Sequence, residues 1–164
     1  MKHLNLGRVL LLALCACLAV TLLTAVSPAR SAYAATASPT ACSNLNYAPG
    51  HWLLNANYKE IWTTCKGNAI SLNMQLDGNF VLYVNGQAKW ASNTSGLTAM
   101  GNYAQFLPNG ALRVYDISTI SGPYLAWSSG TGGKGARLSL QDDGNVVIYN
   151  ASGTAIWATH TSGY

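Results

Sequence analysis

Apolar and polar residues alternate along much of the chain, in short runs that are separated by turn signals. Residues 70–75 alternate strictly, which is typical of a strand with one buried face. Asp77-Gly78 then predicts a tight hairpin turn, and residues 80–83 are rich in the aromatic and β-branched side chains that favour strands. A second hairpin signal at Asn85-Gly86 leads into a further strand over residues 88–92. Because no segment beyond the N-terminal region shows a sustained helical period, the sequence predicts an all-β domain.

This hairpin pattern occurs three times. Residues 75–83 read QLDGNFVLY, residues 141–149 read QDDGNVVIY, and residues 107–115 read LPNGALRVY, an altered copy. Each copy is followed by a tryptophan motif, which reads WASNT, WSSGT and WATHT in turn. Self-similarity with a period of roughly 33 residues indicates a repeat architecture. The predicted repeats cover about 44–96, 97–132 and 133–164.

Three sheets of this kind can bury their apolar faces by packing around a common axis. The expected core contains Leu72, Met74, Phe80, Leu82, Trp90, Leu138, Leu140, Val146, Ile148 and Trp157, with Trp127 from the middle repeat. We therefore interpret the tryptophans as core packing and not as surfaces that stack on a ligand. A β-trefoil is the rival three-fold fold, but its sugar-binding version carries Gln-x-Trp motifs, which this sequence lacks. Propellers need more and longer repeats.

The N-terminal segment has the layout of a secretory signal peptide. Basic residues precede an uncharged apolar run over residues 9–26, and Ala32-Tyr33-Ala34 is a small-x-small pattern of the kind that signal peptidases cut after. An uncleaved membrane anchor is the alternative, because the run is just long enough to span a bilayer. We expect residues 1–34 to be removed and residues 35–164 to form one secreted, extracellular domain.

Setting the leader aside changes the meaning of the charge. The whole chain has a formal net charge of +4, but only six of its nine Lys and Arg residues follow the leader, together with all five acids. The mature domain is therefore nearly neutral, and its basic residues are scattered along the sequence. A nucleic-acid partner normally requires a clustered basic face, so this partner is excluded.

Cysteine usage also fits export. Cys42 and Cys65 are the two cysteines that follow the leader, and such a pair in an exported domain most simply forms one disulfide. Two cysteines are too few for a metal site, and His51 and His160 show no ligand spacing to them. We expect neither a metal nor another cofactor.

The repeated turn segment carries the candidate chemistry at every second position. These residues are Gln75, Asp77, Asn79, Val81 and Tyr83 in the first repeat and Gln141, Asp143, Asn145, Val147 and Tyr149 in the third. Alternate side chains of a strand emerge on one face, so each set can converge on a shallow groove. Amide, carboxylate and phenol groups supply the donors and acceptors that sugar hydroxyls need, and the valine supplies an apolar contact. The simpler interpretation is that Asp and Asn only shape a hairpin turn, but this leaves the recurring Gln and Tyr unexplained.

The pattern QxDxNxVxY, followed by W-A-S/T-x-T, resembles the bulb-type (monocot mannose-binding, B-type) lectin family, over roughly Asn44 to the C-terminus. The resemblance implies a β-prism II fold, with three antiparallel four-stranded sheets around a pseudo-three-fold axis and one potential mannose site on each sheet. It implies that Asp77 and Asn79 bind O2 of mannose, Gln75 O3 and Tyr83 O4, while Val81 packs on the ring. The same roles fall to the matching residues of the third repeat, and no metal takes part. A homodimer formed by exchange of C-terminal strands is also implied, although the sequence leaves the oligomeric state open.

The middle repeat departs from this pattern at four of five positions. Leu107, Asn109, Ala111 and Arg113 replace the Gln, Asp, Asn and Val of the other repeats, and Tyr115 alone is kept. We expect this third site to be degenerate and unable to bind mannose.

The sequence thus predicts a secreted lectin that recognises terminal mannose or mannose-rich glycans through two intact sites. The alternative is a lectin-like antimicrobial protein of the bacteriocin type, which binds a competitor's surface polysaccharide. An interaction protein with vestigial sites is disfavoured by the two intact motifs. An enzyme is not expected, because Asp77 and Asp143 belong to different repeats and no catalytic triad or phosphate-binding loop is present.

Overall fold

The computed structural model describes residues 43–97, 101–117 and 122–164. The predicted signal peptide and Cys42 lie outside these residues. Within them, no helix is long and apolar enough to cross a membrane.

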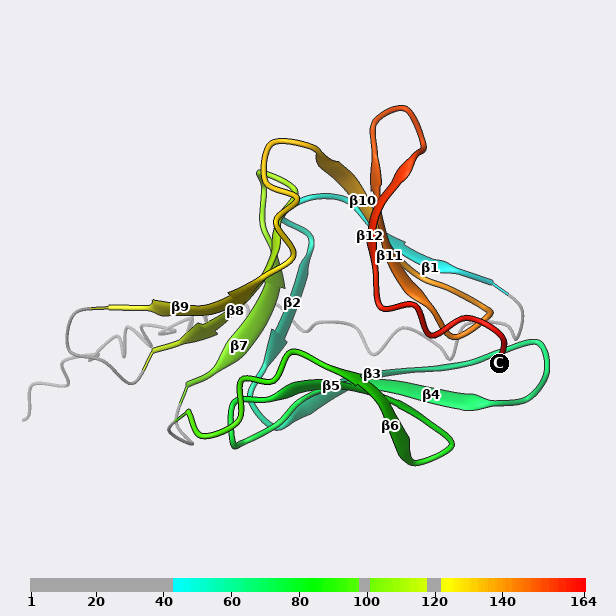
Figure 1. Ribbon diagram of the computed structural model, residues 1–164, viewed down its shortest axis with the longest axis horizontal. Coiled ribbons are helices and arrows are strands. Elements are labelled where there is room, and N and C mark those ends of the chain that lie inside the picture. The colour runs from blue at the N-terminus through cyan, green and yellow to red at the C-terminus, as the bar shows by residue number, and fades with distance from the viewer. Residues whose placement is uncertain (1–42, 98–100, 118–121) are drawn as a thin grey trace, which may run out of the picture. The chain divides into compact units, whose positions relative to one another are not determined.

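Twelve strands, β1 to β12, make up the described domain (Figure 1). They are Leu45–Tyr47 (β1), Trp52–Asn55 (β2), Tyr58–Thr63 (β3), Ala69–Met74 (β4), Phe80–Val84 (β5), Gln87–Ala91 (β6), Tyr103–Phe106 (β7), Leu112–Asp116 (β8), Tyr124–Ser128 (β9), Gly135–Leu140 (β10), Val146–Asn150 (β11) and Ala155–Ala158 (β12). The strands of each predicted hairpin are found within a residue or two of the expected positions, and the all-β prediction is confirmed.

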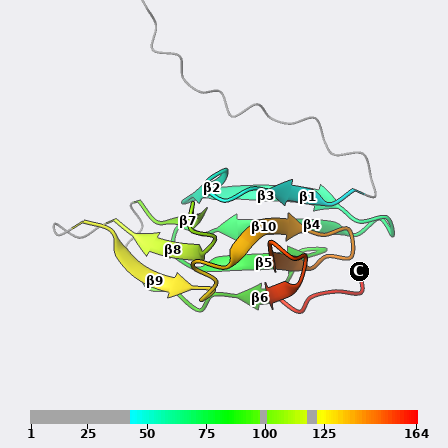
Figure 2. The ribbon, with the colours of Figure 1, turned by 90° about the horizontal axis from the view of Figure 1, so that it is seen from above.

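The strands form three antiparallel sheets of four strands each. Sheet A has the order β1-β10-β11-β12, sheet B the order β2-β7-β8-β9, and sheet C the order β3-β4-β5-β6. Each sheet therefore combines three consecutive strands, which carry one copy of the hairpin pattern, with one strand from residues 45–63. Figure 2 shows these N-terminal strands, β1, β2 and β3, together at one end of the domain. Although they are consecutive in the chain, they join three different sheets.

The inward faces of the sheets form one hydrophobic core. All of the predicted aliphatic core residues are buried within it, together with Phe80. The rings of Trp90, Trp127 and Trp157 pack edge to face against one another, with centroids 5.5 to 5.6 Å apart. One tryptophan comes from each sheet, so the three rings tie the sheets together and the interpretation of the tryptophans as core packing is confirmed.

Two further tryptophans belong to the core and are absent from the sequence-based list. Trp52 and Trp62 are only 3% and 2% exposed, and they lie on β2 and β3. The indole Nε1 of Trp62 also donates a hydrogen bond of 2.9 Å to the carbonyl oxygen of Gln141. This bond joins sheet C to the turn that follows β10.

Polar contacts add to the links between sheets A and C. The phenol of Tyr47 on β1 donates to Glu60 Oε1 on β3 over 3.0 Å, and burial together with the nearby Glu60 charge raises the pKa of Tyr47. Cys65 is disulfide-bonded, and its backbone N–H donates to Asp142 Oδ1 over 2.7 Å. Because Cys42 lies outside the described residues, its pairing with Cys65 stays a prediction.

The C-terminal strand β12 pairs with β11 of its own chain. The expected homodimer also stays a prediction.

Candidate functional site

Strand register places the predicted site residues on the outward faces of sheets A and C. In sheet C, Val81 pairs with Asn73 on one side and with Ala91 on the other, and all three alternate with core residues. In sheet A, Val147 has the same place between Ser139 and Ala158. Each set of five residues is therefore brought together on one sheet, as predicted from the alternation. Val81 and Val147 are only 3% exposed, so the floor of each site is already packed.

The glutamine and tyrosine of each set are hydrogen-bonded to each other. Gln75 Nε2 donates to the Tyr83 hydroxyl oxygen over 2.7 Å, and Gln141 Nε2 donates to the Tyr149 hydroxyl oxygen over 2.8 Å. Since the phenol oxygen accepts this bond, its own proton remains available for donation to a ligand. The amide and the phenol thus fix each other's orientation.

The aspartate serves the turn and still offers a free oxygen. Asp77 Oδ1 accepts from the Asn79 backbone N–H over 3.0 Å, and Asp143 Oδ1 accepts from that of Asn145 over the same distance. Both aspartates are exposed. One carboxylate oxygen therefore shapes the hairpin, and the other can accept a hydrogen bond from a ligand hydroxyl. The turn interpretation and the binding interpretation are compatible.

The asparagine of each set is held by hydroxyl and backbone groups that come directly after β6 in sheet C and after β12 in sheet A. In sheet C, Asn79 Oδ1 accepts from Ser92 Oγ and from the Thr94 backbone N–H, each over 3.3 Å. In sheet A, Asn145 Oδ1 accepts from Thr159 Oγ1 over 3.0 Å and from the Thr161 N–H over 3.2 Å. Because these contacts occupy the amide oxygen, the amide nitrogen is the group of each side chain that can donate a hydrogen bond to a ligand.

These serines and threonines support the candidate sites and are absent from the site residues predicted from the sequence. Thr94 Oγ1 and Thr161 Oγ1 also donate to the carbonyl oxygens of the turn glycines, Gly78 and Gly144, over 2.7 and 2.8 Å. The signal was present in the recurring S/T-x-T of each tryptophan motif, which a Gly follows two residues later. The fold explains this recurrence, because it places each S/T-x-T motif beside the turn of the same sheet.

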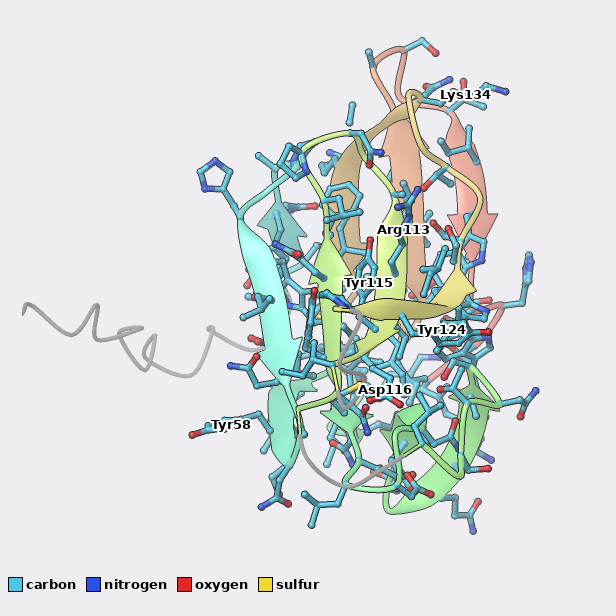
Figure 3. The ribbon with its side chains drawn as sticks, turned by 90° about the vertical axis from the view of Figure 1, so that its left-hand side faces the viewer. Tyr58, Arg113, Tyr115, Asp116, Tyr124 and Lys134 are labelled. Atoms are coloured by element: carbon cyan, nitrogen blue, oxygen red, sulfur yellow. The ribbon has the colours of Figure 1, made fainter. Side chains whose placement is uncertain are left out.

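Sheet B keeps the frame of the site but not its donor set. Asn109 Oδ1 accepts from the Ala111 N–H over 3.1 Å, so the turn has the same geometry as in the other sheets. Ala111 has no side-chain amide, and the Leu107 side chain cannot form a hydrogen bond with the Tyr115 hydroxyl. Arg113 Nη1 instead donates to the Tyr115 hydroxyl oxygen over 3.1 Å, and Figure 3 shows these two side chains as neighbours.

The three tyrosines also differ in what lies beside them. Tyr115 stacks on Tyr103 with ring centroids 5.1 Å apart, and burial together with Tyr115 raises the pKa of Tyr103. The Arg137 guanidinium lies 4.5 Å from the ring centroid of Tyr149 in sheet A. In sheet C the corresponding partner of Tyr83 is the small Ser71. The two candidate sites on sheets A and C therefore have the same central residues but different borders.

Asp77 lies on sheet C and Asp143 on sheet A, in two separate sites.

Across the described ranges, no three His, Cys, Asp or Glu residues are grouped so that they could hold a metal ion.

No protein-family model matches the chain. A mannose-specific lectin of Aloe arborescens is 45% identical over 91 residues, which amount to 54% of this chain and 76% of that protein. Among solved structures, the monomeric monocot mannose-binding lectins of Gastrodia elata are 34% identical, with a TM-score of 0.56 and coverage of 73% of this chain and 98% of theirs.

A second solved structure is the mannose-specific agglutinin of snowdrop (Galanthus nivalis) bulbs, complexed with methyl-α-D-mannoside. It is 33% identical, with a TM-score of 0.51, and the match covers 74% of this chain and 98% of that one.

Proposed function

This chain belongs to the bulb-type, monocot mannose-binding lectin family, and from that membership we propose that it is a secreted lectin which binds terminal mannose through one site on sheet A and one on sheet C. Family membership, together with three antiparallel four-stranded sheets, confirms the predicted β-prism II fold. It also makes the chain a carbohydrate-binding protein and not an enzyme.

The observation that carries the two-site proposal is the shared arrangement of polar groups on sheets A and C. Each sheet presents a tyrosine hydroxyl held by a glutamine, an aspartate with one oxygen not used by the turn, and an asparagine that is held through its amide oxygen, so that its amide nitrogen can donate. A pyranose with adjacent hydroxyls requires such a mixture of donors and acceptors in a small area. The polar groups that are assigned to O2, O3 and O4 of mannose are all present in both sheets.

The proposal is tested by titrating the mature domain with methyl α-mannoside in a calorimeter. We expect two sites per chain, one site in Asp77→Ala or in Asp143→Ala, and none in the double variant. Asn109→Ala is the matched control, because it removes the same turn position from the degenerate site and should leave the stoichiometry at two. Thermal unfolding of each variant shows that the domain remains folded.

Binding by the double variant at the wild-type level would contradict the proposal. Because shallow sites of this kind bind weakly, useful avidity would come from two sites on one chain engaging one glycan surface.

The antimicrobial alternative uses the same two sites, so it differs in target and not in site chemistry. A zone-of-inhibition assay with the purified domain separates the two functions.

Secretion is proposed from the leader sequence. Sequencing the N-terminus of the exported protein tests this, with Ala35 as the expected first residue.

A further inference from the structure

The outward face of sheet B carries a positive charge where the other two sheets carry a negative one. At the turn, Asn109 stands in the place of Asp77 and Asp143, and its side chain forms the same hydrogen bond to the turn backbone. Between the neighbouring strands, Arg113 takes the central place that Val81 has in sheet C. The five repeated positions contain one Asp in sheets A and C and one Arg in sheet B, so their formal charge changes from −1 to +1.

The protein does not neutralise the charge of Arg113. Within the described residues, its guanidinium makes one hydrogen bond, from Nη1 to the Tyr115 hydroxyl oxygen, while Nε is buried and has no partner. All five acids of the chain lie within the described ranges, and none of them pairs with Arg113. Asp116, the acid of sheet B, alternates onto the inward face of β8 and is only 6% exposed. Because a partly buried cation without a counter-ion is costly, this face favours an anionic ligand.

A second cation and neutral polar groups border Arg113. Gln105 lies opposite it on β7, half-buried, and its side chain forms no hydrogen bond in the described part of the chain. The loop after β9 lies against the turn of the sheet, since the Gly133 N–H donates to the Asn109 carbonyl oxygen over 2.7 Å. This loop carries the exposed Lys134, and Figure 3 shows it beyond the end of β8 at which Arg113 lies.

Sheet A also has an arginine at its site but keeps the carboxylate. The Arg137 guanidinium lies 4.5 Å from the ring centroid of Tyr149, and Asp143 belongs to the same site. An anion at sheet A would therefore meet charges of both signs. Sheet B presents the cation without the acid.

We propose that sheet B carries a separate binding site for a sugar that bears a carboxylate, such as a uronic acid residue. Nη1 of Arg113 has a second hydrogen and Nη2 has two, so the guanidinium can hold a carboxylate through two parallel hydrogen bonds. The Tyr115 hydroxyl and the amides of Gln105 and Asn109 supply donors and acceptors for ring hydroxyls, which favours a sugar over an acidic peptide. Lys134 adds attraction at longer range. This site does not depend on mannose binding by sheets A and C.

The experiment uses the whole mature domain with Asp77→Ala and Asp143→Ala, so that the predicted mannose sites do not contribute. Methyl glycosides of glucuronic, galacturonic and mannuronic acid are each compared with the matching neutral hexoside by NMR chemical-shift titration. We expect at least one uronide to bind about 10-fold more tightly than its neutral partner, with the largest shifts at Arg113 and its neighbours. Raising the salt concentration should weaken this binding.

Two substitutions use residues that the other sheets already carry, and thermal unfolding checks that each variant is folded. Arg113→Val introduces the valine of sheets A and C, and it should reduce the uronide affinity to that of the neutral hexoside. Asn109→Asp introduces their aspartate, which keeps the turn bond, and it should weaken uronide binding several-fold by repulsion. Arg113→Lys should retain only part of the affinity, because it keeps the charge and loses the paired N–H groups.

Equal affinities for every uronide and its neutral partner, or uronide binding that Arg113→Val leaves unchanged, would overturn this site. Acetate carries the charge without the ring, so acetate binding as tight as that of the uronide would show an adventitious ion only. Tighter binding of a short Asp-containing peptide would assign this face to a protein partner, and both of these results would also overturn the acidic-sugar site. Because none of these titrations uses methyl α-mannoside, failure here is distinguishable from failure of the proposed mannose binding.

Discussion

At the scale of single residues, hydroxyl groups hold the asparagine side chains of the candidate sites in place. Thr159 Oγ1 donates to Asn145 Oδ1 over 3.0 Å and accepts from the Val146 N–H over 3.0 Å. It also lies 2.8 Å from Thr161 Oγ1. This single hydroxyl therefore joins the asparagine side chain, a strand backbone and the next threonine. Without it, the amide of Asn145 would be held by the Thr161 N–H alone.

Replacing Thr159 with valine tests this positioning role. The substitution keeps the shape of the side chain and removes the hydroxyl, so the amide of Asn145 becomes freer to rotate. We expect mannose affinity at the sheet A site to fall about 10-fold and the unfolding free energy to fall by about 1–3 kcal/mol, because Val146 loses its buried partner. The affinity is measured by calorimetry in the Asp77→Ala background.

Thr159→Ser is the matched control, because sheet C uses Ser92 at this position. It should retain most of the affinity. Equal affinities for the valine and serine variants would show that the hydroxyl does not position Asn145.

At the scale of elements, the hairpin between β4 and β5 is constrained from outside its own two strands. Gly78 has φ +85°, a conformation that favours glycine, and a Cβ added there would lie 2.4 Å from the Cβ of Leu97. The Gly96 and Leu97 N–H groups also donate to the Asp77 carbonyl oxygen, over 3.0 and 3.1 Å. The segment after β6 therefore holds the turn that carries Asp77 in place.

A pair of alanine substitutions separates the effect of backbone conformation from the effect of this contact. Gly86 has φ +78° and an added Cβ would meet nothing within 4 Å, so Gly86→Ala should cost about 1–2 kcal/mol for the left-handed conformation alone. Gly78→Ala should cost a further 1–3 kcal/mol, roughly, because Leu97 must move. Urea unfolding of the two variants measures the difference.

Gly78→Ala should also weaken sugar binding to sheet C, since Asp77 and Asn79 flank the turn. Similar unfolding free energies for the two variants would show that Leu97 does not constrain this hairpin.

At the scale of the whole molecule, the three sheets are joined by core packing and by a small number of polar contacts. Each tryptophan of the triad contacts the other two, and Tyr47 of sheet A donates to Glu60 of sheet C. The raised pKa of Tyr47 makes this second link sensitive to pH. Below the ordinary tyrosine pKa of about 10, the phenol is neutral in both the folded and the unfolded state. Above it, the phenol ionises in the unfolded chain first, so rising pH favours unfolding.

Tyr47→Phe should therefore flatten the fall in stability at high pH. We expect the unfolding free energy of the wild type to decrease above about pH 10 more steeply than that of the variant, by at most about 1.4 kcal/mol per pH unit from this group. Near pH 7 the variant should be less stable by about 1 kcal/mol, because it lacks the hydrogen bond to Glu60. Urea unfolding at a series of pH values gives both quantities. Parallel curves for the two proteins above pH 10 would contradict the assignment.

Much of the site follows from sequence because its causes are local. A period of two determines which side chains share a face, so Gln75, Val81 and Tyr83 could be grouped before the fold was known. The Asp-Gly turns and the inward-facing residues such as Leu72 and Leu82 follow from the same alternation. The substitutions in the middle repeat could be interpreted from the sequence in the same way, since Ala111 has no side-chain amide in any fold.

The tertiary structure decided the remainder, because it depends on residues that are distant in the chain. Any sheet edge offers the same backbone donors and acceptors, so nothing local in residues 45–63 shows that their three strands join three different sheets. That arrangement buries Trp52 and Trp62, and it brings Lys59 beside Asn73 next to the sheet C site. The sequence by itself therefore determined the repeats, the turns and the residues at the centre of each candidate site. The packing of the sheets determined what holds those residues in place and what borders them.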